Sequence, residues 1–222
     1  MGATATTDRF GTANMAMSFD GSTDYIEIQD LGLTGAATLS FWFNAVRTSN
    51  EDRLLSNIDN TKNSSGNQFS LRFNSNKIQI WSSFWANISD VISAGSWYNF
   101  VIVFSNLGGS AAATAYLDGQ ASGLSSTQTF RFWKIGVGSK FFYFGGGPAG
   151  TNFKGTIDEV KIFNRALTAA EILAMYNHEK GKFSVGKDGT LSAVEFVEDP
   201  ALPVQMRSKK QSLTVKGQLI EQ

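Results

Sequence analysis

The 222-residue chain contains no cysteine, a single histidine (His178) and only three prolines. Without cysteine it can form no disulfide framework, no thiolate nucleophile and no cysteine-bound zinc site. One histidine excludes a histidine-rich metal site, and a Ser-His-Asp triad would have to use His178. The chemistry open to this chain therefore rests on carboxylates, amides, hydroxyls and aromatic rings.

Charge is also scarce, because charged residues make up 17% of the chain and 19 basic residues balance 19 acidic ones. A nucleic-acid-binding surface needs a basic surplus or stripe, and neither is present. The first ten residues, MGATATTDRF, have neither a basic nor an apolar stretch, so we expect no signal peptide. No apolar run approaches 18 residues, so we also expect no membrane-spanning helix.

Alternating apolar and polar residues, the pattern of half-buried strands, recur along the chain. They are separated by turn residues such as Asn74-Ser75-Asn76 and Asp118-Gly119, and several strands with such turns are typical of a sandwich or jelly roll. The sequence predicts an all-β, two-sheet antiparallel jelly-roll sandwich. The predicted strands are residues 15–19, 38–44, 69–73, 78–80, 98–104, 113–117, 134–137, 141–144 and 157–163.

One short helix is predicted near residue 170. Thr168 and Glu171 have the spacing of a capping box, in which the hydroxyl and the carboxylate each bond a free backbone amide. Leu167 and Ile172 occupy the two positions of a hydrophobic staple. We expect the helix to end at about residue 177.

The C-terminal segment, residues 181–222, differs in character from the predicted sandwich of residues 1–180. Residues 183–185 and 191–197 flank a Lys187-Asp188-Gly189 turn, which predicts a hairpin, and residues 211–220 predict further strand. The segment has too few large apolar residues for a core of its own. This C-terminal β arm must pack on the sandwich, pair with another subunit or hang free.

Five motifs along the chain point to a known family. They are MSFDGSTDYI (17–26), TLSFWF (38–43), WYNFV (97–101), AYLDG (115–119) and FKGTIDEVKIFNRALT (153–168). Together they resemble the laminin-G-like members of the concanavalin A-like lectin/glucanase jelly-roll superfamily, over about residues 8–178. The superfamily includes lectin domains, carbohydrate-binding modules, adhesion modules and some glycosidases, so the resemblance implies the fold more firmly than the ligand.

The resemblance implies a structural calcium ion near the first and last strands, with Asp20, Asp24 and Asp158 as its candidate ligands. Asp158 shares strand parity with Val160 and Ile162, so it is expected to face inward and to need hydrogen-bond donors or a cation. Carboxylate oxygens suit calcium. Alternatively, Asp20 is a turn residue, Asp24 caps the loop and Asp158 is bonded to amides.

Aromatic residues gather at the end of one predicted hairpin. Trp81, Phe84 and Trp85 lie within five residues and are followed by Asn87. Exposed aromatic faces can stack on sugar rings while a neighbouring amide bonds the hydroxyls, so these four residues form a candidate ligand-binding site. The alternative is that the rings pack under a loop, since large aromatic side chains are mostly buried.

We expect no enzymatic activity. The glycosidases of the resembling superfamily carry a Glu-x-Asp-x-x-Glu type motif, which this chain lacks. Asp158 and Glu159 are adjacent, and strand alternation would direct them to opposite faces rather than to one cleft.

Two non-catalytic functions remain. The first is a displayed subunit of a virion or surface fibre, of the phage head or tail decoration type, in which the C-terminal arm binds other subunits and the sandwich attaches to a surface glycan. The second is a carbohydrate-binding module of a secreted or surface polysaccharide-degrading system. Both place the protein on a virion or an extracellular surface.

Overall fold

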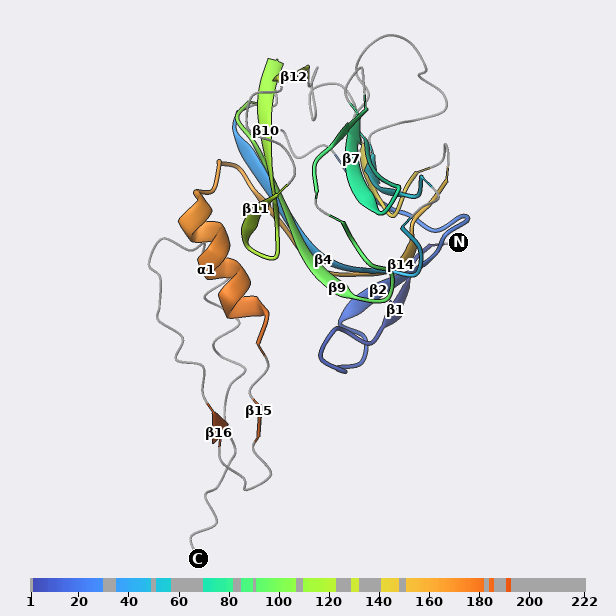
Figure 1. The fold of residues 1–222 in the computed structure, drawn as a ribbon. Coiled ribbons are helices and arrows are strands. Elements are labelled where there is room, and N and C mark those ends of the chain that lie inside the picture. Colours follow the sequence, from blue (N-terminus) through green and yellow to red (C-terminus); the bar gives the residue numbers. More distant parts are fainter. Residues whose placement is uncertain are drawn as a thin grey trace, which may run out of the picture.

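Two antiparallel sheets packed face to face form the body of the protein, with one helix on the outside (Figure 1). The structure is a computed structural model. It describes residues 2–29, 35–48, 51–56, 70–81, 85–89, 91–106, 110–122, 129–131, 141–147, 151–181, 184–185 and 191–192.

The larger sheet has eight strands, and its long members β4, β9 and β14 curve beneath the smaller sheet (Figure 1). Its path is β1 (Thr4–Thr6), β2 (Ala16–Asp20), β14 (Lys154–Phe163), β4 (Ala37–Ala45), β9 (Trp97–Phe104), β10 (Ser110–Leu117) and β11 (Gln120–Ser122), with β12 (Thr129–Arg131) also paired to β10.

The smaller sheet has six strands, and the predicted hairpin around Ser75-Asn76 lies in it. Its path is β3 (Ile26–Gln29), β13 (Phe141–Phe144), β5 (Arg53–Ser56), β6 (Ser70–Asn74), β7 (Lys77–Trp81) and β8 (Trp85–Asn87). Strands that are adjacent in this sheet can be far apart in the sequence, as β13 is from β3 and β5, which is typical of a jelly roll. The predicted fold class is confirmed.

The core between the sheets is rich in phenylalanine. Leu39, Phe41 and Phe43 of β4 point into it, as their alternation predicts, and all three are buried. Phe41 contacts the rings of Phe100 and Phe144, with ring centroids 5.7 and 5.9 Å apart, and so joins β9 of one sheet to β13 of the other.

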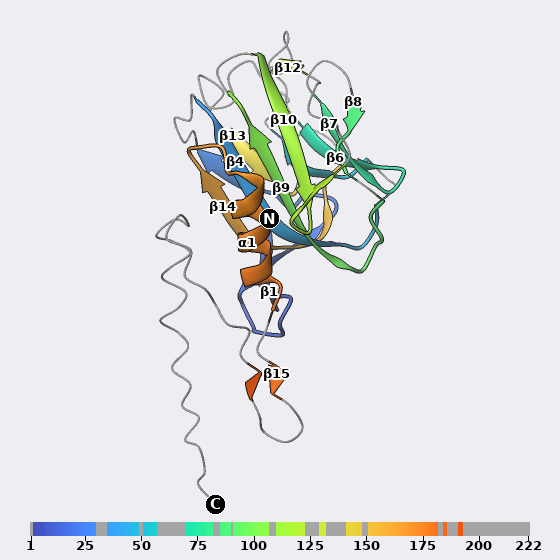
Figure 2. The ribbon, with the colours of Figure 1, turned by 60° about the vertical axis from the view of Figure 1, so that its left-hand side comes forward.

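Helix α1 (Ala169–Glu179) lies along the outer face of the larger sheet (Figure 2). Thr168 and Glu171 form the predicted capping box. Bonds from Arg165 to Glu171, assisted by Thr168, lower the pKa of the Glu171 carboxyl to about 2. Buried residues of the helix pack on Val101 and Phe163, so β9 is covered on both faces.

A β-bulge in β14 changes the predicted strand parity. Ile157 pairs with Phe43 and Asp158 with Trp42, but the next pair is Lys161 with Ser40, so β14 has one residue more than β4. Glu159 takes a positive φ of 52° there. The expectation that Asp158 faces inward with Val160 and Ile162 is therefore wrong. Asp158 lies on the outer face, and Val160 and Ile162 come after the extra residue, so they no longer share its strand parity.

Part of the predicted C-terminal hairpin is present as β15 (Ser184–Val185) paired with β16 (Leu191–Ser192). This pair forms a sheet of its own. The predicted strand at 134–137 and the prediction for 211–220 lie outside the described residues, and the boundary between a sandwich of 1–180 and an arm of 181–222 stays a prediction.

Candidate functional site

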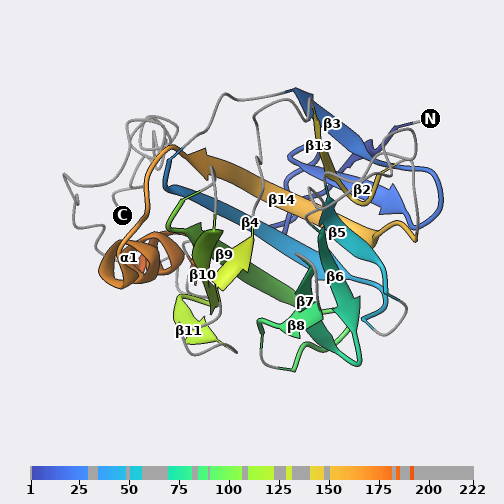
Figure 3. The same cartoon turned by 90° about the horizontal axis from the view of Figure 1, so that it is seen from above.

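The outer faces of the two sheets differ in what covers them. The larger sheet carries α1 on its outer face, whereas the smaller sheet lies on the opposite side of the molecule from the helix (Figure 3). The outer face of the smaller sheet, called here the small-sheet face, is defined by Arg53, Ser56, Ser70, Arg72, Gln79, Asn87 and Tyr143.

Strand alternation builds the small-sheet face. Leu71, Phe73, Ile78 and Ile80 of β6 and β7 are fully buried in the core. Because successive side chains of a strand point to opposite faces, the polar residues between them lie on the outside.

A chain of hydrogen bonds crosses three strands of this face. The Arg72 Nε donates to Gln79 Oε1 at 3.1 Å, and the Gln79 Nε2 donates to Asn87 Oδ1 at 3.0 Å. Arg72 Nη1 also forms an ion pair with Glu51 Oε2 at 2.8 Å. The result is a polar ladder over β6, β7 and β8 that holds its amides in fixed positions.

A second guanidinium lies beside this ladder, because Arg53 of β5 is the direct cross-strand partner of Arg72. Burial and the positive charge of Arg72 both lower the pKa of Arg53. The described part of the small-sheet face therefore carries two arginines, and the carboxylate of Glu51 forms an ion pair with one of them, Arg72.

On the β13 side, the face is formed by a tyrosine and a glycine turn. The Tyr143 ring packs edge-on against Tyr25 with centroids 5.4 Å apart, and Ser56 Oγ donates to the carbonyl of Gly146. Gly146 has a φ of 127°, and a Cβ there would lie 2.2 Å from Asn152 Oδ1. Only glycine lets the backbone approach Asn152 so closely.

The predicted sugar-binding residues fall on this part of the fold. Trp81 pairs with Trp85 across the β7–β8 hairpin and with Ser70 across β6 and β7. Asn87 is exposed and bonded to Gln79, and Phe84 lies outside the described residues. Sequence reasoning missed Arg53, Arg72 and Gln79, although the polar positions in the β6 and β7 alternation carried that signal.

The predicted calcium ligands are held by other partners. Asp20 Oδ1 accepts from the amides of Ser22, Thr23 and Asp24 at 2.8, 3.0 and 3.1 Å, and Asp24 Oδ2 accepts from the Asp20 amide at 3.0 Å. The amide of Ser22, together with those of Asp24 and Thr23, holds the pKa of Asp20 below its usual value. This loop matches the alternative in which both aspartates are turn and cap residues.

Asp158 lies in a buried ionic cluster on the outer face of the larger sheet. Arg9 Nη1 donates to Asp158 Oδ2 at 2.7 Å, and Arg9 lies 3.9 Å from Glu159 Oε1. The carboxylates of two adjacent residues thus approach the same guanidinium. The expectation that Asp158 and Glu159 point to opposite faces is therefore wrong, because the β-bulge interrupts the alternation of side chains at this point. Burial raises the pKa of Asp158, and Arg9 partly offsets this.

The same cluster fastens the end of α1. Glu179 accepts from the Trp42 indole at 2.8 Å and from Lys161 Nζ at 2.6 Å, and its carbonyl accepts from Arg9 at 2.9 Å. The Tyr176 ring stacks on Trp42 with centroids 5.7 Å apart. The N-terminal segment, β4, β14 and the helix are therefore joined at one point.

Across the described ranges, no group of three or more histidine, aspartate or glutamate side chains is arranged to hold a metal ion. Asp158 is therefore not gathered with Asp20 and Asp24. Calcium binding by the Asp20 loop stays a prediction.

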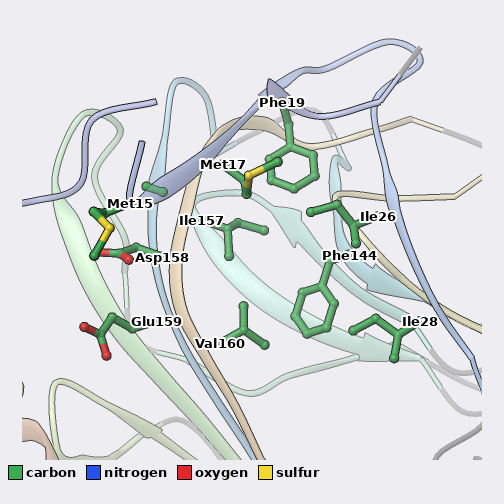
Figure 4. A pocket seen from close by; sticks show the side chains of 11 residues that line it. Met15, Met17, Phe19, Ile26, Ile28, Phe144, Ile157, Asp158, Glu159 and Val160 are labelled. Atoms are coloured by element: carbon green, nitrogen blue, oxygen red, sulfur yellow. The ribbon is translucent and has the colours of Figure 1, made fainter. Parts of the chain in front are cut away.

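An apolar pocket of about 260 Å³ opens between the two sheets at their β2 and β3 ends. Figure 4 shows Met17, Phe19, Ile26 and Phe144 pointing into it. Its two polar lining residues, Asp158 and Glu159, belong to the ionic cluster. The pocket thus has few groups that could orient a hydroxyl-rich ligand, unlike the small-sheet face.

Replacing Arg9 tests the ionic cluster. In Arg9→Met, Asp158 stays buried without its cation, and we expect the free energy of unfolding in urea to fall by about 3 kcal/mol. Adding Asp158→Asn to this variant should recover part of the loss. A loss below about 1 kcal/mol, with no recovery in the double variant, would show that the pair is not holding these segments together.

Chelation tests the Asp20 loop. Because amides already bond Asp20 and Asp24, the alternative in which both are turn and cap residues predicts the same Tm in excess EDTA and in millimolar calcium. A Tm that rises with calcium in the wild type, and not in Asp20→Asn, would establish the calcium site instead.

No helix in the described ranges is long and apolar enough to cross a membrane.

Solved structures share this fold at low sequence identity. Domain 4 of an extracellular GH43 arabinanase from Geobacillus stearothermophilus, solved with arabinotriose, has a TM-score of 0.59 and 19% identity over 78% of this chain and 81% of that domain. The botulinum neurotoxin serotype D binding domain has a TM-score of 0.52 and 17% identity over 75% of this chain and 43% of its own. At these identities the likeness is one of fold.

An enzyme is also among the similar structures. The sialidase of Trypanosoma rangeli has a TM-score of 0.59 and 15% identity, over 77% of this chain and 29% of the sialidase. A search of curated proteins gives no match.

The family described as the concanavalin A-like lectin/glucanases superfamily matches residues 20–173, which is most of the described sandwich. The match includes four of the five motifs in full and residues 20–26 of the first, and it extends into helix α1. Together with the two-sheet jelly roll, it shows that this chain belongs to the concanavalin A-like lectin/glucanase superfamily.

Proposed function

We propose that this protein is a non-catalytic glycan-binding sandwich and that it binds its ligand on the small-sheet face. The observation that carries the proposal is the Arg72–Gln79–Asn87 ladder, which lies on an outer sheet face in register with Trp81 and Trp85. It places fixed polar groups beside aromatic positions.

The ladder suits sugar hydroxyls, which both donate and accept hydrogen bonds. A side-chain amide carries two N–H donors and a carbonyl with two lone pairs. Gln79 and Asn87 share one bond with each other, so each amide keeps further capacity for a ligand. Amides that are already oriented lose less conformational entropy on binding than free side chains do.

Similar structures support a ligand of this class. The arabinanase domain was solved with arabinotriose, and the neurotoxin domain is a receptor-binding domain. Since a sialidase is also among the similar structures, the absence of catalysis is part of the proposal. In its favour, Arg9 and Lys161 engage the adjacent carboxylates of Asp158 and Glu159, so this pair is not directed into an open cleft.

The test is binding to immobilised plant and microbial polysaccharides, followed by titration of the best ligand. We expect Gln79→Ala/Asn87→Ala to bind about thirtyfold more weakly, because two hydrogen bonds of roughly 1 kcal/mol each are lost. Asn177→Ala, an exposed amide on α1, is the matched control and should bind like the wild type. Equal affinity of the double variant would remove the small-sheet face as the binding site.

A second candidate, assembly through the C-terminal arm, has one observation in its favour. The β15–β16 pair forms its own two-stranded sheet, and so short a hairpin is not stable alone in water. This supports pairing of the arm with another surface, as in a virion or surface-fibre subunit. The two candidates are compatible, since a displayed subunit can bind glycan.

Solution mass distinguishes the arm's role. We expect the full chain to be a trimer or larger by light scattering and a chain ending at Gly181 to be a monomer, because the sandwich core lies before that residue. Two monomers of equal Tm would contradict assembly through the arm.

A further inference from the structure

Two like charges face each other on the small-sheet face. Arg53 and Arg72 are direct partners across β5 and β6. Directly opposed residues of antiparallel strands have their Cβ atoms about 5 Å apart, and like charges there destabilise the sheet. The positive charge of Arg72 acts on Arg53 strongly enough to lower its pKa, in addition to the effect of burial.

The two arginines differ in what neutralises them. Arg72 has the carboxylate of Glu51 at 2.8 Å and the amide oxygen of Gln79 at 3.1 Å. Arg53 forms no ion pair with any described residue, and its buried Nη1 has no hydrogen-bond partner there. A buried donor without a partner is unfavourable, and a charged one more so.

The nearest carboxylate in the sequence is already engaged. Asp52 is fully buried and accepts from Arg47 Nε at 2.6 Å and from Arg47 Nη2 at 3.0 Å. It therefore forms a bidentate pair with Arg47 rather than with Arg53. Glu51 acts on Arg53 only at a distance, since its carboxylate pairs with Arg72, so within the described ranges no carboxylate forms an ion pair with Arg53.

Two more buried polar atoms close to Arg53 lack partners among the described residues. Ser70 Oγ is one, and Ser70 lies on the small-sheet face as a neighbour of Arg72 in β6. The other is Oδ1 of Asn152, a residue whose backbone forms a bridge with Arg53. Ser70 can donate or accept, and the Asn152 oxygen can accept. Both atoms are buried, as is Arg53 Nη1, so a ligand meets the partly exposed Arg53 side chain first.

We propose that Arg53, supported by Arg72, binds the carboxylate of an acidic sugar, so that the ligand of the small-sheet face is a uronate-containing glycan. A guanidinium matches a planar carboxylate with two parallel N–H bonds, and a bound carboxylate would relieve the repulsion between the two arginines. Sugar hydroxyls would then meet the Gln79–Asn87 amides. This inference rests on the proposed function and names its ligand class.

A first experiment needs no knowledge of the natural glycan. Because Arg72 repels its guanidinium and its buried Nη1 has no partner among the described residues, Arg53 costs the folded protein stability, and Arg53→Gln should unfold at the same Tm as the wild type or higher. Lys77→Gln, which removes one charge from the same sheet face, is the matched control and should leave Tm unchanged. A large fall in Tm for Arg53→Gln alone would show that Arg53 is a structural residue and would overturn the proposal.

The binding experiment compares polygalacturonate with its fully methyl-esterified form, which has the same backbone without the charge. We expect the wild type to bind the acid at least about tenfold more tightly than the ester, and Arg53→Gln to lose this preference. Arg53→Lys, which keeps the charge but not the fork, should retain only part of it. Lys77→Gln should keep the full preference.

The outcomes separate the two proposals. Binding to neutral arabinan or to the ester with no preference for the acid would leave the proposed function standing and overturn the uronate inference. Preference for the acid that survives Arg53→Gln would overturn the assignment to Arg53. No binding to any polysaccharide would contradict the proposed function, and the inference with it.

Discussion

The buried ionic cluster around Arg9 joins the N-terminal segment, β4, β14 and helix α1 at one point on the outer face of the larger sheet. Arg9 holds Asp158 of β14 and the end of α1, while Glu179 bonds Trp42 and Lys161. Through these contacts and the apolar contacts of α1 with Val101 and Phe163, the helix and the N-terminal segment lie on the outer face of the larger sheet. On the small-sheet face, Asn87 is exposed and Arg53, Arg72 and Gln79 are partly exposed, whereas Ser56, Ser70 and Tyr143 are buried.

This arrangement also explains why the acidic residues are poor candidates for the chemistry they first suggested. Asp158 and Glu159 could have served a metal or a hydrolytic cleft, but the bulge directs both to Arg9. Asp20 and Asp24 close their own loop through backbone amides. The proposed ligand site therefore rests on the amides and guanidiniums of the small-sheet face.

Residue alternation was enough to predict the fold and most strands, because β4, β6, β7 and β9 each direct one regular set of side chains into the core between the sheets. The capping box predicted α1 for a similarly local reason. The bulge at Glu159 escaped prediction, since a single extra residue reverses parity without any local signature. The sequence also did not predict contacts between residues that are distant along the chain. Examples are the ion pair of Arg9 with Asp158, which are 149 residues apart, and the pairing of Arg53 with Arg72.

The site was predicted only in part for the same reason. Trp81, Trp85 and Asn87 are neighbours in the sequence, so their clustering was visible there. The rest of the small-sheet face comes from β5, β6 and β13, which the sheet order brings together from residues 53 to 144. Only the sheet topology shows that a polar ladder lies beside that hairpin, together with Arg53, which forms no ion pair with a described residue.

The most direct test of the central claim is a crystal structure of the full chain with a bound oligosaccharide selected by polysaccharide screening. The account predicts sugar density on the small-sheet face, within hydrogen-bond distance of Gln79 or Asn87. Ordered sugar at the apolar pocket or over the Asp20 loop, with the small-sheet face empty, would contradict it.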